Sequence, residues 1–258
     1  NYKKPIPEID VKITDRSILK RLGTGHSIEE VCSAAGLSDE QFEKWWSTQL
    51  AARVPSSKGI RTSTVDAEIL RDKWGIPHIY AERDEDLFFG YGYAMAQDRL
   101  WQLDYLRRKA TGRLSEVIGP SALETDTISH TVGITQLAEA EVRRMSVQTR
   151  TRLDAFSGGI NEFISESTDL LPIEFGLLDY SPEPWSPRDS IAIWTEFRWY
   201  LTGRLPVIVI PELAMQTLDS DELYNAFLTG EAENESILAK GMYPSRRSNI
   251  ASVGQTVS

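Results

Sequence analysis

The stretch Gly92–Gly119, GYAMAQDRLWQLDYLRRKATGRLSEVIG, decides how this chain is interpreted, because it sets charged residues inside an apolar and aromatic helical pattern. The pattern predicts one long helix from about Glu85 to Lys109. Gly90 and Gly92 each cost a helix about 1 kcal/mol relative to alanine. Glycines kept at that cost indicate that another backbone approaches the helix closely.

Asp98 and Arg99 lie between apolar turns of this predicted helix. A buried charge is costly unless it is paired, so both groups need partners among neighbouring side chains, backbone carbonyls or another chain. We expect a structural polar network rather than a catalytic pair, because the segment contains no histidine to act as a base. Asp104 and Arg108, spaced i,i+4, are expected to form an ordinary surface pair.

Composition excludes several classes of partner. The net charge of −10 disfavours nucleic acids and anionic membranes. The longest apolar run, Leu205 to Met215, is interrupted by Pro206 and Pro211 and is shorter than the roughly 18 residues of a membrane span. The single cysteine, Cys32, cannot form an internal disulfide and is expected to be a buried structural thiol.

The first 60 residues are expected to be an arm followed by a small helical module, separate from residues 61–258. Residues 13–50 resemble a helix-turn-helix, with Gly36 at the turn. One interpretation is therefore a non-catalytic regulatory or interaction protein. Recognition of DNA is disfavoured, because the second helix begins Asp39-Glu40, and we expect its Trp45-Trp46 pair to anchor the module to the main body or to another chain.

After a linker at 52–63, the spacing of the apolar residues changes from the period of a helix to the alternation of a strand. Alternation between Val65 and Tyr80, interrupted by Asp72-Lys73-Trp74-Gly75, predicts a β-hairpin with Gly75 at positive φ and Pro77 on an edge strand. The remaining chain is mostly helical by pattern. Asp84 or Asp86 is expected to cap the long helix, and Ser186-Pro187 to start another.

The run LRDKWGIPHIYAERDEDLFFGYGYAMAQDRLWQLDYLRRKATGRLSEVIG (Leu70–Gly119) resembles the opening of the α chain of the penicillin acylase family. Later GGINEFI, EPWSPRDSIAI and FRWYLTG fit in the same order, so the resemblance covers roughly Thr64 to Leu238. It implies a mainly α chain with a small β-hairpin that contributes to an αββα N-terminal-nucleophile hydrolase sandwich, completed by a separate β chain. It also implies a periplasmic enzyme made as one precursor and processed into two chains.

The resemblance places the catalytic serine at the N-terminus of the β chain, with its own α-amino group as base. An α-amine suits that role because its pKa is near 8. No catalytic residue is therefore assigned here. Ser248-Asn249 is followed by IASVGQTVS, without the tryptophan of the family pattern, and is expected to be tail.

The resemblance also implies residues that serve the partner's site. The helix TEFRWYLTGR corresponds to the one that lends side chains to the acyl pocket, and we assign Tyr200, Leu201 and Arg204 to that role. An arginine there would suit an acyl group that ends in a carboxylate. Glu212 is assigned as the single ligand from this chain to a Ca²⁺ shared with the β chain. His26, His78 and His130 are expected to be structural.

Overall fold

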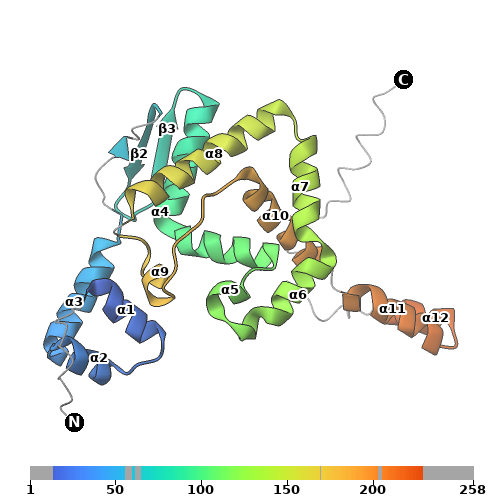
Figure 1. Ribbon diagram of the computed structural model, residues 1–258. Coiled ribbons are helices and arrows are strands. Elements are labelled where there is room, and N and C mark those ends of the chain that lie inside the picture. The colour runs from blue at the N-terminus through green and yellow to red at the C-terminus, as the bar shows by residue number, and fades with distance from the viewer. Residues whose placement is uncertain (1–13, 56–59, 62–64, 169, 203–204, 229–258) are drawn as a thin grey trace, which may run out of the picture. The chain divides into compact units, whose positions relative to one another are not determined.

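The computed structural model describes residues 14–55, 60–61, 65–168, 170–202 and 205–228 (Figure 1). The chain divides into two compact units, Asn1–Tyr200 and Leu201–Ser258. It is mainly helical with a small antiparallel sheet, which confirms the coarse fold class. Among the described helices, none combines the length and the apolar character needed to cross a membrane.

The described elements of the first unit are ten α-helices, a 3-10 helix (Pro120–Ala122) and three strands; the last two residues of α10 belong to the second unit. The helices are α1 (Asp15–Gly23), α2 (Ile28–Ala35), α3 (Asp39–Ala52), α4 (Asp84–Thr111), α5 (Ser115–Ile118), α6 (Leu123–Val132), α7 (Ile134–Arg144), α8 (Val147–Glu166), α9 (Ile173–Leu177) and α10 (Pro187–Thr202). The strands, paired in the order β1-β2-β3, are β1 (Ile60–Arg61), β2 (Ala67–Arg71) and β3 (Pro77–Ala81).

The predicted hairpin is formed by β2 and β3, which pair antiparallel with Ile69 opposite Ile79. Ile69 is buried towards α4, whereas Tyr80, on the other face of the sheet, is exposed. Gly75 has a φ of 79°, as the turn requires. Within the described sheet β3 pairs only with β2, so Pro77 does lie on an edge strand.

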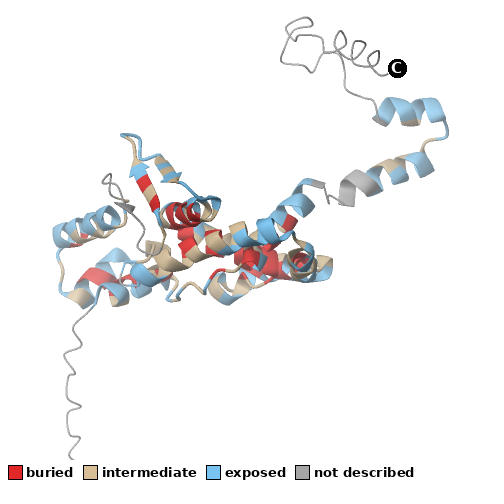
Figure 2. Cartoon of the chain, turned by 90° about the horizontal axis from the view of Figure 1, so that it is seen from above, coloured by how far each residue is buried: buried red, intermediate tan, exposed pale blue. Residues whose placement is uncertain are grey.

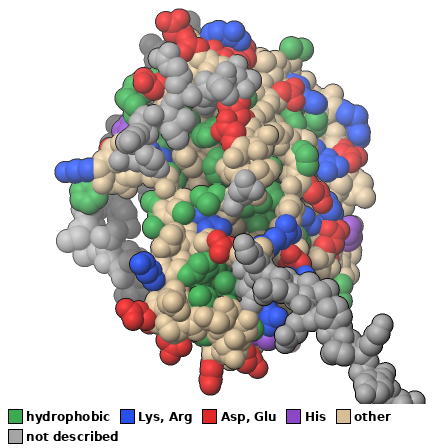
Figure 3. All heavy atoms as spheres, turned by 60° about the vertical axis from the view of Figure 1, so that its left-hand side comes forward, with side chains coloured by type: hydrophobic (Ala, Val, Ile, Leu, Met, Phe, Trp, Pro, Cys, Tyr) green, Lys and Arg blue, Asp and Glu red, His purple; other side chains and the backbone are tan. Residues whose placement is uncertain are grey.

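The core of the first unit is built around α4 and α8, where the buried residues concentrate (Figure 2). A Cβ on Gly92 would lie 2.0 Å from the Phe156 carbonyl oxygen, and one on Gly159 would lie 1.9 Å from the Phe89 carbonyl oxygen. The two helices therefore touch backbone to backbone at reciprocal glycines, which confirms the close approach predicted for α4. Apolar side chains remain exposed among charged ones on the face shown in Figure 3.

Helices α1 to α3 form the N-terminal module, with a small core of their own made by Ile18, Val31, Cys32 and Phe42. Ser27 and Ser38 each close a capping box at the start of α2 and α3. Burial raises the pKa of the Cys32 thiol, in keeping with the predicted structural role. The boundary at residue 60 stays a prediction.

The module docks on α9 and its flanks. A Cβ on Gly23 would lie 1.8 Å from the Leu177 carbonyl oxygen, so α1 and α9 are in backbone contact. Arg53 at the end of α3 donates from Nε to the Leu171 carbonyl oxygen at 2.7 Å. Trp45 donates to Asp15 within the module at 2.9 Å, whereas Arg16 and Lys20 of α1 pair with Asp179 after α9.

The second unit is described as two helices, α11 (Leu205–Thr217) and α12 (Asp221–Leu228). Pro211 lies inside α11. Both helices leave large apolar side chains exposed, among them Ile210, Leu213 and Phe227.

Candidate functional site

The C-terminal half of α10 presents an exposed apolar and aromatic surface. Its exposed members are Trp194, Phe197, Trp199, Tyr200 and Leu201. The two assigned residues, Tyr200 and Leu201, are 53% and 60% exposed, so their side chains are available to another molecule. Exposed aromatic clusters of this kind mark sites of interaction with a ligand or a partner.

The cations around this surface are paired. Arg198 Nη2 lies 2.8 Å from Glu141 Oε2, and Lys109 Nζ lies 2.7 Å from Glu196 Oε1 and over the ring of Tyr200. Arg198 is thus engaged with an acid, and the assignment of a carboxylate-binding group falls on Arg204. Arg204 lies outside the described residues.

Glu212 is exposed on α11, and its Oε1 accepts a hydrogen bond of 2.8 Å from Gln216 Nε2. Its second oxygen remains available to a hard cation such as Ca²⁺, which prefers carboxylate ligands but needs six to eight oxygens. The described residues hold no group of three or more acidic, histidine or cysteine side chains that could bind a metal. A Ca²⁺ at Glu212 therefore requires oxygens supplied from elsewhere.

The predicted charged pair in α4 lies where the helix breaks. Arg99 has φ −143° and ψ 21°, which are not helical, and no proline causes the kink. Asp98 and Arg99 are exposed rather than buried, and Asp98 takes part in a polar network, as predicted.

The partner of Asp98 comes from the hairpin. Arg71 Nη2 lies 2.9 Å from Asp98 Oδ1 and donates to Gln97 Oε1 at 2.7 Å, and Arg71 Nη1 donates to the Gly75 carbonyl oxygen at 2.8 Å. The Arg71 side chain is only 4% exposed. It therefore ties the hairpin turn to the break in α4, a partner that sequence spacing did not reveal.

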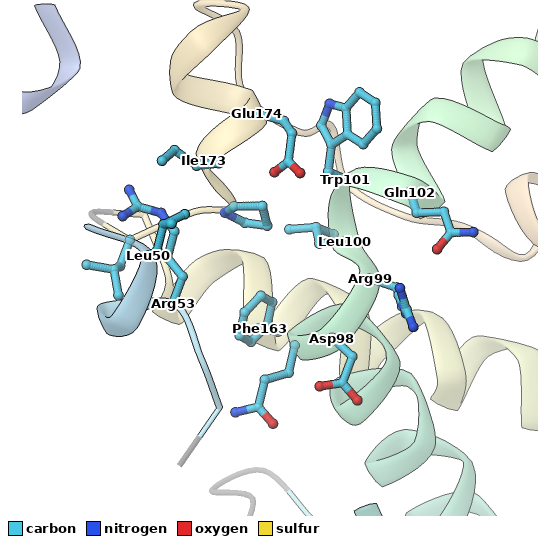
Figure 4. Close-up of a pocket in the computed structure, with 13 residues that line it drawn as sticks. Leu50, Arg53, Asp98, Arg99, Leu100, Trp101, Gln102, Phe163, Ile173 and Glu174 are labelled. Carbon is cyan, nitrogen blue, oxygen red and sulfur yellow. The ribbon is translucent and has the colours of Figure 1, made fainter. Parts of the chain in front are cut away.

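A cleft of about 440 Å³ opens beside this break, and we refer to it as the α4 cleft (Figure 4). Its walls come from the end of α3, the break in α4, α8 and the start of α9. The lining residues are Leu50, Arg53, Gln97, Asp98, Arg99, Leu100, Trp101, Gln102, Phe163, Leu170, Pro172, Ile173 and Glu174. The N-terminal module thus contributes one wall.

The buried charges of α4 lie beyond the break. Asp104, Arg107 and Arg108 are 1%, 4% and 4% exposed. Asp104 accepts from both arginines, and Arg107 also donates to the carbonyl oxygens of Glu183 and Pro184. The expectation of a surface Asp104–Arg108 pair was wrong, because the segment at 183–189 covers it.

This network extends to Glu183 and Arg113, whose Nη1 and Nη2 donate to the two Glu183 carboxylate oxygens at 2.9 and 2.7 Å. The hydrogen bonds from Arg113 lower the pKa of Glu183 to about 2. His130 Nε2 lies 2.9 Å from the Gly112 carbonyl oxygen, a contact that suits the structural role predicted for it. His78 is 3.4 Å from Asp72 in the hairpin turn.

Comparison with known proteins identifies the family of this chain. The family model described as penicillin amidase matches residues 66–256. The chain is 37% identical over 147 residues to penicillin acylase 2 proenzyme of Pseudomonas sp. (strain SE83), covering 56% of this chain and 19% of that protein. It is 30% identical over 222 residues to acyl-homoserine lactone acylase QuiP of Pseudomonas aeruginosa, covering 85% of this chain and 25% of that protein.

A solved structure is also similar. Thermostable penicillin G acylase from Alcaligenes faecalis matches with a TM-score of 0.56 and 26% identity, over 70% of this chain and 97% of the solved chain. This chain therefore spans a quarter or less of these two curated relatives but accounts for nearly all of one polypeptide of a solved acylase.

Proposed function

We propose that this chain, which belongs to the penicillin amidase family, is the α subunit of an amidohydrolase that cleaves a linear amide. The observation that carries the proposal is the match to 97% of a solved acylase chain together with the family match over residues 66–256. The named relatives are acylases, which supports this function over a regulatory protein built on residues 13–50.

In the proposed reaction the serine hydroxyl at the N-terminus of a β subunit attacks the amide carbon. Its proton passes to the α-amino group of the same serine, which then protonates the leaving amine. Water hydrolyses the acyl-serine that remains. This chain contributes no nucleophile in the proposal; its hairpin and helices complete the αββα sandwich of the β subunit.

We assign Tyr200, Leu201 and Arg204 to the acyl pocket. The exposure of Tyr200 and Leu201 at the end of α10 supports the assignment, because both present apolar surface for an acyl chain. Arg198 is held by Glu141, so an acyl group that ends in a carboxylate would depend on Arg204.

Expression of the whole reading frame, followed by hydrolysis assays on a panel of acylated amines, tests the function. We expect two chains on a gel and activity that is lost when the β-chain serine is replaced by alanine. Hydrolysis by this chain without a companion would refute the proposal.

The pocket assignment has its own test in the assembled enzyme. Tyr200→Ala is expected to lower kcat/KM for apolar acyl groups about 10-fold, because a pocket contact of this size contributes 1–3 kcal/mol. Tyr80→Ala, which removes an exposed aromatic ring from the hairpin, is the matched control. Arg204→Gln should affect glutaryl amides more than butyryl amides, and an equal effect on both would remove Arg204 from the pocket.

We also propose that Glu212 is the ligand of this chain to a Ca²⁺ shared between the chains, and that the enzyme is periplasmic. Glu212→Gln should lower the calcium content of the purified protein, whereas Glu222→Gln on α12 should not. Equal calcium content in both variants would exclude Glu212 as a ligand.

A further inference from the structure

The α4 cleft has the dimensions and lining of a small-molecule site. Its volume of about 440 Å³ lies within the roughly 300–1,000 Å³ of ligand pockets. Leu50, Leu100, Phe163 and Pro172 give it apolar walls from four separate segments. The rest of the lining includes polar and charged side chains, so a ligand with an apolar body and a polar group fits it.

Two of the charges at the cleft are already engaged. Asp98 is paired with Arg71 at 2.9 Å. Arg53 donates from Nε to the Leu171 carbonyl oxygen and from Nη1 to the Gln49 carbonyl oxygen, each at 2.7 Å. Arg99 stands at the opposite side of the cleft, and its guanidinium points away from Glu174 (Figure 4).

Glu174, on the first turn of α9, is the second acid of the cleft lining besides Asp98. Its side chain is partly buried, and its carboxylate points towards Leu100 (Figure 4). Among the described residues it has no side-chain hydrogen bond and no ion pair within 4.0 Å, although Arg53 is near enough to feel its charge. A carboxylate on an apolar wall is stabilised by a cation that arrives with a ligand.

We propose that the α4 cleft binds a small organic amine, with its ammonium group on Glu174 and its apolar body against Leu100 and Phe163. The aromatic rings of Phe163 and Trp101, which also line the cleft, favour a cation near their faces. The remaining ammonium protons stay hydrated, because the cleft is open to solvent.

The test is calorimetric titration of the purified protein, with any chain that accompanies it, using n-hexylammonium chloride. We expect saturable binding at least about 10-fold tighter than that of 1-hexanol or hexanoate, because a charge-assisted hydrogen bond to Glu174 is available only to the cation. Glu174→Gln should reduce the affinity about 10-fold or more. Glu43→Gln, which neutralises an exposed glutamate of α3 outside this cleft, should leave it unchanged.

Equal affinities for the amine and the alcohol in the unmodified protein would overturn the proposal, and so would an unchanged affinity in a folded Glu174→Gln protein. The alcohol comparison keeps the test decisive if that variant does not fold. Because binding is measured without hydrolysis, this outcome is independent of the amidohydrolase proposal.

Discussion

At Gly92, a single missing methyl group permits the main helix pair to form. A Cβ there would lie 2.0 Å from the Phe156 carbonyl oxygen, which belongs to a rigid backbone. At Gly158 an added Cβ would instead meet the Phe89 ring at 3.1 Å, and a side chain can move. The two glycines occupy the same interface, but we expect substitution to cost more at Gly92 than at Gly158.

Gly92→Ala is therefore expected to lower the free energy of unfolding by more than about 2 kcal/mol, despite the gain in helix propensity. Gly158→Ala, the matched control, should change it by less than about 1 kcal/mol. Urea unfolding of both variants measures the difference. Equal stability of the two would show that α4 and α8 can separate at little cost.

At the residue scale, the close approach at the α4 glycines could be predicted from the sequence, but the burial of Asp104 and Arg108 could not. Gly90 and Gly92 were informative because glycine has a known cost in a helix. Asp104 and Arg108 misled because an i,i+4 acid–base pair is usually exposed. Their cover comes from residues 183–189, which are too distant in sequence for spacing to reveal.

At the scale of elements, the Glu183–Arg113 contact fastens the segment before α10 to the end of α4. Because the folded-state pKa of Glu183 is about 2, below the unfolded value near 4.3, its charge stabilises the fold at neutral pH. That contribution is present above about pH 4.3 and is lost as the pH falls towards 2.

Glu183→Gln should thus be less stable than the unmodified protein at pH 7, and the difference should shrink as the pH falls from 5 to 2. Urea unfolding at several pH values measures it. Glu124→Gln alters an exposed glutamate of α6, and its free energy of unfolding should follow the same pH dependence as that of the unmodified protein. A difference in stability between Glu183→Gln and the unmodified protein that does not change with pH would mean that Arg113 does not hold the Glu183 carboxylate.

Element types followed well from sequence, and their ends less well. The hairpin was found from period-two alternation and Gly75, and α10 from Ser186-Pro187, where the Ser186 amide donates to Asp189 at 2.8 Å. The N-cap of α4 is Arg83, without a side-chain hydrogen bond, rather than Asp84 or Asp86. Helix α9 could not be predicted, because a helix of five residues is too short to show a periodic pattern.

At the scale of the whole molecule, the Arg71–Asp98 ion pair joins the hairpin to α4. Both elements lie within Leu70–Gly119, the run of sequence that resembles the family. Asp98→Ala leaves the buried Arg71 guanidinium without its counter-charge, which we expect to cost about 1–3 kcal/mol. The hairpin would then lose its attachment to the break in α4. We expect less of the two-chain protein proposed above.

A gel of the purified protein and its unfolding curve measure both effects. Asp154→Ala, which removes an exposed partner of Arg150 on α8, is the control. Normal processing and unchanged unfolding in Asp98→Ala would show that the contact serves neither assembly nor stability.

The family could be identified from sequence because Leu70–Gly119 carries many specific residues in order. The α4 cleft could not be identified from the sequence, because its walls come from segments around residues 50, 100, 163 and 173 that only tertiary packing brings together. Tyr200, Leu201 and Glu212 are located by the structure on α10 and α11, and the roles assigned to them stay predictions.

The docking of α1 on α9 has a practical consequence for anyone trimming the gene. A truncation that starts at residue 66, where the family match begins, would remove Leu19 from its contact with Gly176 and expose the apolar face of α9. Such a shortened protein would be expected to precipitate during purification, so a poor yield from it would say nothing about the chemistry of the part retained.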